Sequence, residues 1–298
     1  MKGFLKHRGE KTSSAAFTQI PEAPPPRQFG ASGDCQIWAA TAGVQLARAW
    51  ALVYGVYLAR GYAQIDKQHL WYGLHDALPE TATFLAERAG QAVAALTVVP
   101  DSPCDLPADA AFAAELAELR APGRRLCEIA NLASVDSENH RGAETLNHLF
   151  KLAWLLARRL DGATDLVIRV SPQHRTLFER RLLFRTIGGE RPAGGPGGSP
   201  GVLLALDLTD AEERFRRKYG SGERSLHRFF VDPGTEPALL DWLRRCRRAL
   251  TEITLRRFFV DTRPLIPEAP EAARTYLAGR YPDCDIEPAG PQAGKTPQ

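Results

Sequence analysis

Apolar and polar residues alternate with two different periods in the middle of the chain, and the change of period predicts a strand–helix–strand unit between Arg124 and Phe184. The segments RRLCEIANLASV and DLVIRV are apolar enough to be buried strands. Between them, AETLNHLFKLAWLLARRL has the period of an amphipathic helix, and a short helix follows the second strand. Such a unit implies at least one parallel pair of strands.

Segments on both sides of this unit extend the predicted sheet. TATFLAE and QAVAALTVV are separated by Arg88-Ala89-Gly90 and predict a β-hairpin. VPDSPCDLPAD, with its three prolines, predicts a loop that leads into a helix over AAFAAELAELR. Ile187–Pro200 is expected to be a loop before a last buried strand, GVLLALDL. Together these elements indicate an α+β fold with a mixed sheet of about six strands.

Composition divides the chain into a core and flanking segments. Residues 1–36 are rich in Pro, Gly, Ser and charge, which is typical of a disordered leader, and residues 37–210 form the predicted core. An apolar stripe of helical period in EPALLDWLRRCRRALTEITL makes residues 211–264 an expected helical extension. Residues 265–298 have several prolines and a polar end, so we expect a tail there.

An aromatic stripe marks the helix predicted from about Trp38 to Tyr62. Trp50, Tyr54 and Tyr57 recur at i, i+4 and i+7 and therefore share one face. A stripe of this kind belongs to a hydrophobic core more often than to a binding site. In the functional alternative the stripe lines a substrate channel, with Trp50 and Tyr54 as substrate contacts.

Length and composition exclude several classes of protein. With 298 residues and 44% apolar content, the chain can bury a sizeable core. No apolar run is long enough to cross a bilayer, and the opening MKGFLKHRGEKTSS lacks the apolar centre of a signal peptide, so we expect no integral membrane segment and a cytoplasmic protein. Five Cys without a CxxC pair argue against a disulfide framework and against a zinc site, and no metal is expected.

Charge is unevenly distributed along the chain. The net charge is +3, yet residues 211–263 hold 13 Lys or Arg against 8 Asp or Glu. A basic face there could receive an acidic partner. The alternative is a compositional habit, because Arg outnumbers Lys 31 to 7 throughout the chain. No aromatic-interleaved basic stripe or finger motif is present, so we expect no binding to nucleic acid.

Three motifs occur in an order that resembles a known family. They are VVPDSPCDLPADAAF after the hairpin, GRRLCEIANLAS on the central strand, and VSPQHRTLFERRLLF after the second strand. From about Gln45 to Leu208 the chain resembles the long-chain N-acyl amino acid synthases, relatives of the acyl-homoserine-lactone synthases within the acyl-CoA N-acyltransferase (GNAT) fold. The resemblance implies a GNAT-like mixed central sheet flanked by helices, with the C-terminal helical extension added to it.

The resemblance also implies an activity. An N-acyltransferase of this kind moves a long acyl chain from an acyl thioester to the amino group of an amino acid or similar small amine. The thioester, acyl carrier protein (ACP) or acyl-CoA, is a co-substrate, and no tightly bound cofactor is expected. Acyl carrier protein is then a candidate partner, since the basic region could attract an acidic carrier.

Glu128 is the only acid in the first predicted strand, and two interpretations of it remain open. Strand charges usually lie on a solvated face, where Glu128 would pair with Arg124, Arg125 or an Arg of a neighbouring strand. The resemblance instead implies that Glu128 is the base that removes a proton from the acceptor amine, which is mostly protonated near pH 7. Backbone N–H groups of the same strand would stabilise the oxyanion of the tetrahedral intermediate.

The start of the central helix is the candidate donor site. A phosphate of the donor's pantetheine arm can bind at a helix N-terminus, here at Arg141, Gly142 and Ala143. Glu144 stands where the superfamily has a second small residue, which fits a carrier-protein donor with one phosphate better than coenzyme A. A plain helix cap is the alternative.

Other positions depart from the related families. Ala130-Asn131 stands in place of Ser-Arg of the acyl-homoserine-lactone synthases, and Thr97 in place of their strand Arg, which argues against S-adenosylmethionine as acceptor. Glu179 replaces the superfamily's Tyr, a common general acid. Asn131 stays a candidate substrate contact. His174 matches a His of the family motif, and it either orients substrate or caps the helix that it begins.

A second class of function competes with catalysis. The chain could be a catalytically lapsed GNAT-like module that binds an acyl carrier or a protein partner. An active enzyme predicts an apolar channel that ends beside Glu128. A lapsed module predicts a closed channel or a Glu128 held in an ion pair.

Overall fold

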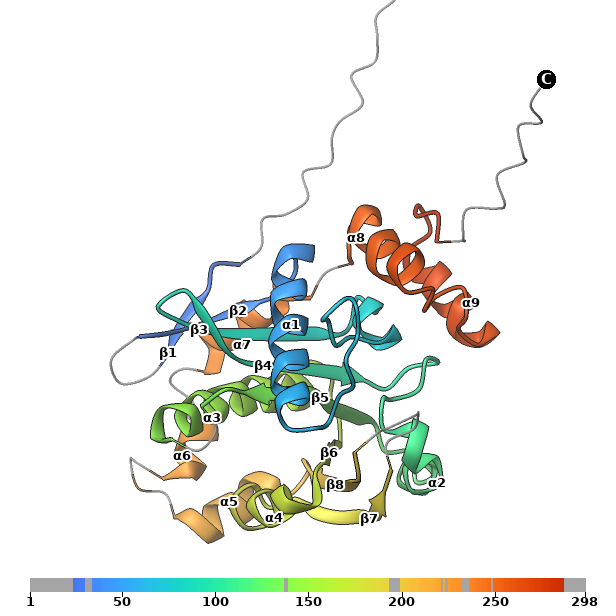
Figure 1. The fold of residues 1–298 in the computed structure, drawn as a ribbon. Coiled ribbons are helices and arrows are strands. Elements are labelled where there is room, and N and C mark those ends of the chain that lie inside the picture. Colours follow the sequence, from blue (N-terminus) through green and yellow to red (C-terminus); the bar gives the residue numbers. More distant parts are fainter. Residues whose placement is uncertain are drawn as a thin grey trace, which may run out of the picture.

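A mixed sheet of eight strands organises the molecule, and helices cover both of its faces (Figure 1). The structure is a computed structural model that describes residues 24–29, 34–136, 139–192, 199–220, 222, 225–231, 236–247 and 249–286. Within these residues the strand order is β1-β2-β3-β4-β5-β6-β8-β7. The strands are β1 Arg27–Phe29, β2 Cys35–Ala39, β3 Ala82–Arg88, β4 Gln91–Pro100, β5 Leu126–Ser134, β6 Asp165–Val170, β7 Arg185–Arg191 and β8 Gly201–Asp207.

Neighbouring strands pair antiparallel, apart from β5 and β6, which are parallel. This pair is the strand–helix–strand unit predicted from the apolar periods, with a long helix as its crossover. The helices that follow the sheet strands in the core are α1 Gly43–Ala59, η1 Leu74–Ala77, α2 Asp109–Arg120, α3 His140–Leu155, η2 Leu156–Leu160, η3 Pro172–His174 and α4 Arg175–Leu182. The C-terminal helices are α5 Ala211–Tyr219, α6 Leu226–Val231, α7 Glu236–Arg244, α8 Glu252–Arg256, η4 Arg257–Thr262 and α9 Glu271–Arg280.

Alternate positions of the central strands point to opposite faces, and each face has its own core. Cys127 and Ile129 of β5 pack with Leu149 and Trp154 of α3 on one face. On the other face Leu126 packs with Leu116 of α2, and Ala133 packs with α1. Glu128 therefore lies on the face that α1 and α2 cover.

The predicted α+β architecture is confirmed, but the sheet is larger than expected. The prediction of about six strands was wrong because edge strands give weak apolar signals. Ile187–Pro200 was expected to be a loop, yet β7 runs through Arg191 with mostly exposed side chains. Residues 193–198 of that expected loop lie outside the described residues.

The N-terminal boundary also differs from the prediction. Strand β1 and the start of β2 fall within the expected leader, and the helix expected from Trp38 begins at Gly43. Cys35, Ile37 and Ala39 are buried while the residues between them are half-buried, a period of two that belongs to a strand. Residues 1–23 and 30–33 of the expected leader lie outside the described residues.

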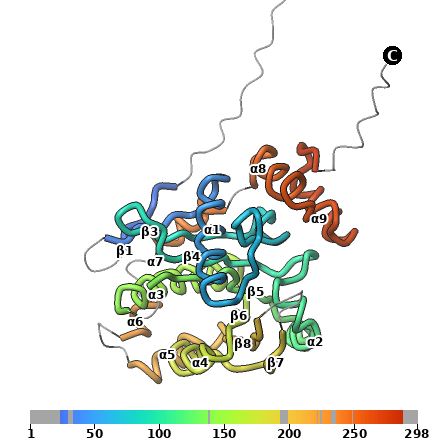
Figure 2. Tube along the Cα trace, viewed as in Figure 1, coloured from blue at the N-terminus to red at the C-terminus, as the bar shows by residue number. Residues whose placement is uncertain are grey.

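The C-terminal helices form a second, smaller core with α1. Figure 2 shows α8 and α9 beside one another at one corner of the molecule, while α4 and α5 lie at the opposite end of the sheet. Leu277 of α9, in the segment expected to be tail, is fully buried with Trp50 and Phe259. The Tyr281 hydroxyl donates to the Ala77 carbonyl at 2.6 Å. Residues 287–298 of the expected tail are outside the described residues.

Among the helices of the described residues, none is both long and apolar enough to cross a membrane.

Candidate active site

The two parallel strands separate partway along their length. β5 and β6 are in register from Leu126↔Asp165 to Ile129↔Ile168. Beyond this point β5 continues to Ser134 with β4 as its partner, through Ala133↔Ala95 and Ser134↔Ala94. The β6 side of β5 is thus open to other groups, and the Tyr57 hydroxyl of α1 donates to the Leu132 carbonyl there at 3.3 Å.

Glu128 lies one residue before this separation and is almost completely buried, with 3% of its surface exposed. Its Oε2 accepts a hydrogen bond from the Ala108 amide at 2.9 Å. The alternative of an ion pair with Arg124, Arg125 or an Arg of a neighbouring strand is wrong, since Glu128 forms no ion pair within the described residues. Arg124 pairs with Asp165 and with Asp207, the latter at 2.7 Å, and Arg125 donates to the Gly162 carbonyl.

Burial makes the Glu128 carboxyl an unusually weak acid. It raises the pKa of this carboxyl to about 8, and the negative charge of Asp109 acts in the same direction. The Ala108 amide, Arg169 and Arg120 act against this rise but do not cancel it. An ordinary glutamate is a far weaker base than an amine, so the raised pKa lowers the free-energy cost of moving a proton from an ammonium group to Glu128.

A bulge in β5 follows Glu128 directly. Asn131 has a φ of 50°, in the left-handed region that Asn tolerates better than most residues, and the register with β4 shifts between Ala95 and Thr97. The Asn131 side-chain amide donates to Asp76 Oδ1 at 3.4 Å and to Thr97 Oγ1 at 3.3 Å. The bulge is therefore held from inside the protein, beside the open edge of β5.

Asp76 is the centre of this buried polar network. It accepts hydrogen bonds from Trp50 Nε1 at 3.2 Å and from the Gly73 amide at 2.9 Å, besides Asn131. Burial raises its pKa to about 6, less than for Glu128, because these three donors favour the ionised form. The network ties α1, η1, β4 and β5 together around the bulge.

Comparison with known proteins decides the family. The family model of the N-acyl amino acid synthase FeeM matches residues 48–207, just over half of the chain. The chain belongs to this family. It is an N-acyltransferase with the expected GNAT-like fold, and the resemblance inferred from the three sequence motifs is confirmed.

The solved structure of FeeM supports the fold. FeeM, an N-acyl amino acid synthase from uncultured soil microbes, is 24% identical and superposes with a TM-score of 0.53, over 63% of this chain and 94% of that one. The AHL synthase LasI is 17% identical, with a TM-score of 0.44 over 59% of this chain and 92% of its own. An acyl-CoA N-acyltransferase from Pseudomonas aeruginosa is 16% identical, with a TM-score of 0.37 over 58% and 97%. No curated protein matches the chain.

The aromatic stripe of α1 divides between core and site in this member of the FeeM family. Trp50 is fully buried and stacks on Tyr72, with ring centroids 4.5 Å apart. Tyr54 is buried, and its hydroxyl accepts from the Asp66 amide at 2.9 Å. Both proposed substrate contacts thus have partners within the protein, and it is Tyr57, the third residue of the stripe, that reaches the open edge of β5.

His174 lies at the rim where β6 ends. It is half-buried, and burial, together with the positive charge of Arg60, lowers its pKa below the usual value. Its neighbour Gln173 donates to the Tyr62 hydroxyl at 2.8 Å, which joins this rim to the end of α1. Within the described part of the chain no hydrogen bond connects His174 with Glu128, so a role in orienting substrate stays a prediction.

The start of α3, the candidate donor site, is capped by its own residues. Asn139 Oδ1 accepts from the Gly142 amide at 2.8 Å, and the Asn139 carbonyl accepts from the Ala143 amide at 3.0 Å. A Cβ on Gly142 would lie 1.8 Å from the Asp136 carbonyl oxygen, so this close approach of the backbone already requires glycine. The exposed Arg141 remains available to a phosphate.

Glu179 and Thr97, the two other departures, do not meet Glu128. Glu179 of α4 accepts a hydrogen bond from Thr186 and forms an ion pair with Arg175. Thr97 Oγ1 lies 3.0 Å from Thr83 Oγ1 and belongs to the network of the bulge. Neither side chain supplies a general acid at the point where the strands separate.

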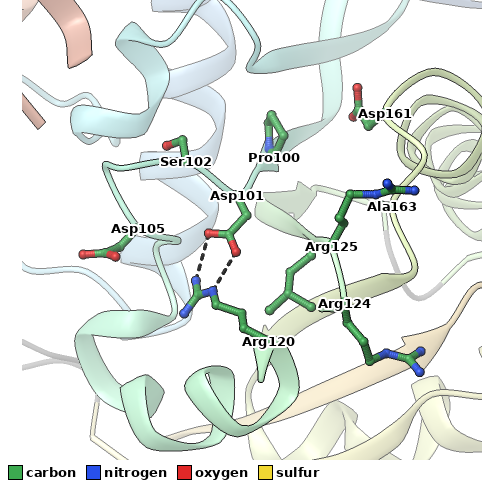
Figure 3. A pocket seen from close by; sticks show the side chains of 10 residues that line it. Pro100, Asp101, Ser102, Asp105, Arg120, Arg124, Arg125, Asp161 and Ala163 are labelled. Atoms are coloured by element: carbon green, nitrogen blue, oxygen red, sulfur yellow. Dashed lines mark hydrogen bonds and ion pairs between the residues drawn. The ribbon is translucent and has the colours of Figure 1, made fainter. Parts of the chain in front are cut away.

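A cavity of about 530 Å³ opens at the other end of β5, where the parallel strands begin (Figure 3). Several of its charged residues form ion pairs. Arg120 binds Asp101 at 2.6 Å, as the dashed lines in Figure 3 show, and Asp161 pairs with Arg247. Since this cavity lies away from the separation of β5 and β6, it is not the expected channel to Glu128.

Three residues of the site were not predicted to belong to it: Tyr57, which was expected only as part of the aromatic stripe, Asp76 and Arg169. Arg169 had a readable signal, because it is a cation within the apolar run DLVIRV, as Glu128 is an acid within the preceding strand. Asp76 lies in a loop-like segment, and only the fold brings it beneath the bulge.

Proposed function

We propose that this N-acyltransferase moves a long acyl chain from a carrier thioester to the amino group of an amino acid or similar small amine. One observation carries the proposal. Glu128, a buried carboxyl without an ion-pair partner among the described residues, lies next to the point where β5 and β6 separate. Its pKa of about 8 lies much closer to that of an ammonium group than the pKa of an ordinary glutamate does, which suits a base that must take a proton from the amine.

The reaction follows from this arrangement. Glu128 takes a proton from the acceptor ammonium, and the neutral amine nitrogen attacks the thioester carbonyl carbon. The oxygen of that carbonyl becomes negative, and backbone N–H groups of β5 at the open edge stabilise it. The intermediate still has two protons on its nitrogen. As it collapses, the C–S bond breaks, the thiol, whose pKa of ~8.5 lets it leave as thiolate, takes the second of these protons, and the neutral amide is formed. The proton held by Glu128 passes to solvent.

An acyl carrier protein is the donor that we favour. The arm of such a carrier has one phosphate, and the start of α3 offers Arg141 as its charged partner. The basic region after the core, residues 211–263, gives less support to a carrier-protein donor than its excess of Lys and Arg indicated. Arg245 pairs with Asp241 at 2.8 Å, and Arg247 pairs with Asp161, while Arg248 lies outside the described residues. Arg244 is exposed and remains free to attract an acidic carrier.

A lapsed acyl-binding module is the second candidate, and one observation favours it. Glu128 is 3% exposed, and the Ala108 amide at the start of α2 rests on its carboxylate. An amine can reach Glu128 only if the segment around Ala108 moves. A module that has lost its reaction would keep this arrangement closed.

The two candidates are separated by product analysis. Purified protein is incubated with a long-chain acyl carrier protein or acyl-CoA and a mixture of amino acids and simple amines, and products are identified by mass spectrometry. We expect an N-acyl amino acid that grows with time and with enzyme concentration. Binding of the acylated carrier without any amide product would support the lapsed module.

A further inference from the structure

Arg169 of β6 faces the same side of the sheet as Glu128. Glu128 is in register with Val167, and Arg169 follows two residues later on the same face. Neighbouring strands lie ~4.8 Å apart and rise ~3.3 Å per residue, which separates the Cα atoms of Glu128 and Arg169 by ~8 Å. Arg169 also comes directly after Ile168, the last residue of β6 in register with β5. Its side chain therefore starts where the two strands separate.

Among the residues that the structure describes, the guanidinium of Arg169 has one hydrogen-bond partner. Nη2 donates to the Ser199 carbonyl at 2.5 Å, while Nε is buried and has no hydrogen-bond partner in the described residues. No carboxylate there forms an ion pair with it, in contrast to Arg120 and Arg124, which each bind two. A buried donor without a partner is costly, and more so when it carries charge.

The backbone makes room for this cation. A Cβ on Gly201 of β8 would lie 2.4 Å from Arg169 Nε and 3.0 Å from its Cζ, so only glycine admits the guanidinium at this place. Burial lowers the pKa of Arg169 below its ordinary value, while Tyr57 and the charge of Glu128 act in the opposite direction. Arg169 is thus a cation kept beside a base, with donors left for an anion.

We propose that Arg169 binds the carboxylate of the acceptor and so selects amines that carry an acid group. The inference rests on the proposed function and names a specificity residue of the same site. In an α-amino acid the amino and carboxylate groups are attached to one carbon, so an acceptor between Arg169 and Glu128 presents one group to each. The planar guanidinium fits a carboxylate through two parallel hydrogen bonds, which a lysine ammonium cannot match.

The test compares an amino acid with its primary amide, which keeps the amine and the side chain but lacks the charge. Arg169→Gln should lower kcat/KM for the amino acid by about 10- to 100-fold, the loss of one charge-assisted contact. For the amide, kcat/KM should change less than about threefold, and KM for the donor should not change. Arg169→Lys should keep part of the wild-type preference for the amino acid over its amide. The exposed Arg185 of β7 provides the matched control, Arg185→Gln, which should behave as wild type.

A binding measurement keeps the inference testable without turnover. By calorimetry, the wild type should bind an N-acyl amino acid at least about tenfold more tightly than the corresponding N-acyl amino acid amide, and Arg169→Gln should bind the two alike. Equal binding of both compounds by the wild type, or equal loss of both in the variant, would overturn the role of Arg169. A wild type that prefers the carboxylate but forms no product would contradict the proposed function and leave Arg169 as a carboxylate-binding residue.

Discussion

Two buried carboxyls in this protein show how local donors decide acidity. Glu128 has one amide donor and a pKa of about 8, whereas Asp76 has three donors and a pKa of about 6. Desolvation acts on both, and hydrogen bonds to the ionised form offset more of it at Asp76. Asp76 is therefore suited to hold the bulge, and Glu128 is left as the group that can exchange a proton near neutral pH.

The raised pKa of Glu128 should make the stability of the protein depend on pH. The unfolded chain loses this proton near pH 4.5 and the folded protein near pH 8, so between these values the folded state binds more protons and its stability falls as pH rises. Glu128→Gln removes this titration. Its melting temperature relative to wild type should thus increase from pH 5 to pH 8.5, by an amount that corresponds to a few kcal/mol in the free energy of unfolding.

Thermal unfolding of both proteins over this pH range provides the measurement. The exposed Glu118 of α2 offers a matched control, since Glu118→Gln should follow wild type at every pH. A difference between Glu128→Gln and wild type that stays constant with pH would mean that the carboxyl titrates normally.

At the scale of elements, strand β5 combines three features: a buried acid, a bulge and an open edge. The apolar runs predicted β5, β6 and their parallel pairing, because buried parallel strands read as continuous apolar segments. The bulge was not predicted, since one polar residue within such a run does not reveal its φ angle. β7 was missed for the opposite reason. Most of its residues are exposed and two of them are glycines. The strand pairs with β8 through its backbone, so the sequence shows no apolar pattern there.

The bulge depends on Asn131 in two separable ways. Asn131→Gly keeps the left-handed backbone and loses the two side-chain hydrogen bonds, so we expect a loss of about 1–2 kcal/mol in the free energy of unfolding. Asn131→Asp places a second carboxylate against Asp76 and should cost more at pH 8 than at pH 5, where Asp76 is largely protonated. Urea denaturation at the two pH values measures both effects. Equal stability of Asn131→Asp and wild type at pH 8 would show that the network does not hold the bulge.

At the scale of the whole molecule, the C-terminal helices complete the core that positions α1. Leu277, Phe259 and Trp50 pack together, so the helix that carries Tyr57 to the open edge is held from both sides. This packing joins residues more than 200 positions apart, and no local pattern predicts it. The prolines around α9 indicated a tail, although Ala273 and Leu277 have the spacing of a buried helical face. Sequence patterns found Glu128 through its motif, whereas Asp76, Tyr57 and Arg169 join it only through tertiary structure.

Delivery of the donor also belongs to this scale, because it joins the start of α3 to the gap between β5 and β6. If Arg141 binds the donor phosphate, Arg141→Ala should raise KM for the acyl carrier donor several-fold, with KM for the acceptor and kcat unchanged. Steady-state kinetics with each substrate varied in turn gives both constants. The exposed Arg228 of α6 supplies the control, Arg228→Ala. Equal donor KM for Arg141→Ala and wild type would leave α3 with a capped start and no phosphate site.

The most direct test of the proposed base is the pH dependence of a single turnover, measured at saturating donor and acceptor for wild type, Glu128→Gln and Glu118→Gln. Below a pH of about 8, the rate for wild type and Glu118→Gln should fall about tenfold per pH unit, because Glu128 must be ionised to accept the proton. This falling part of the pH profile, the acidic limb, should begin at the same pH when an acceptor of lower amine pKa is used. At pH 8, Glu128→Gln should be slower by about 10²–10⁴ and lack the limb. A Glu128→Gln variant with the rate and pH profile of wild type would contradict the account.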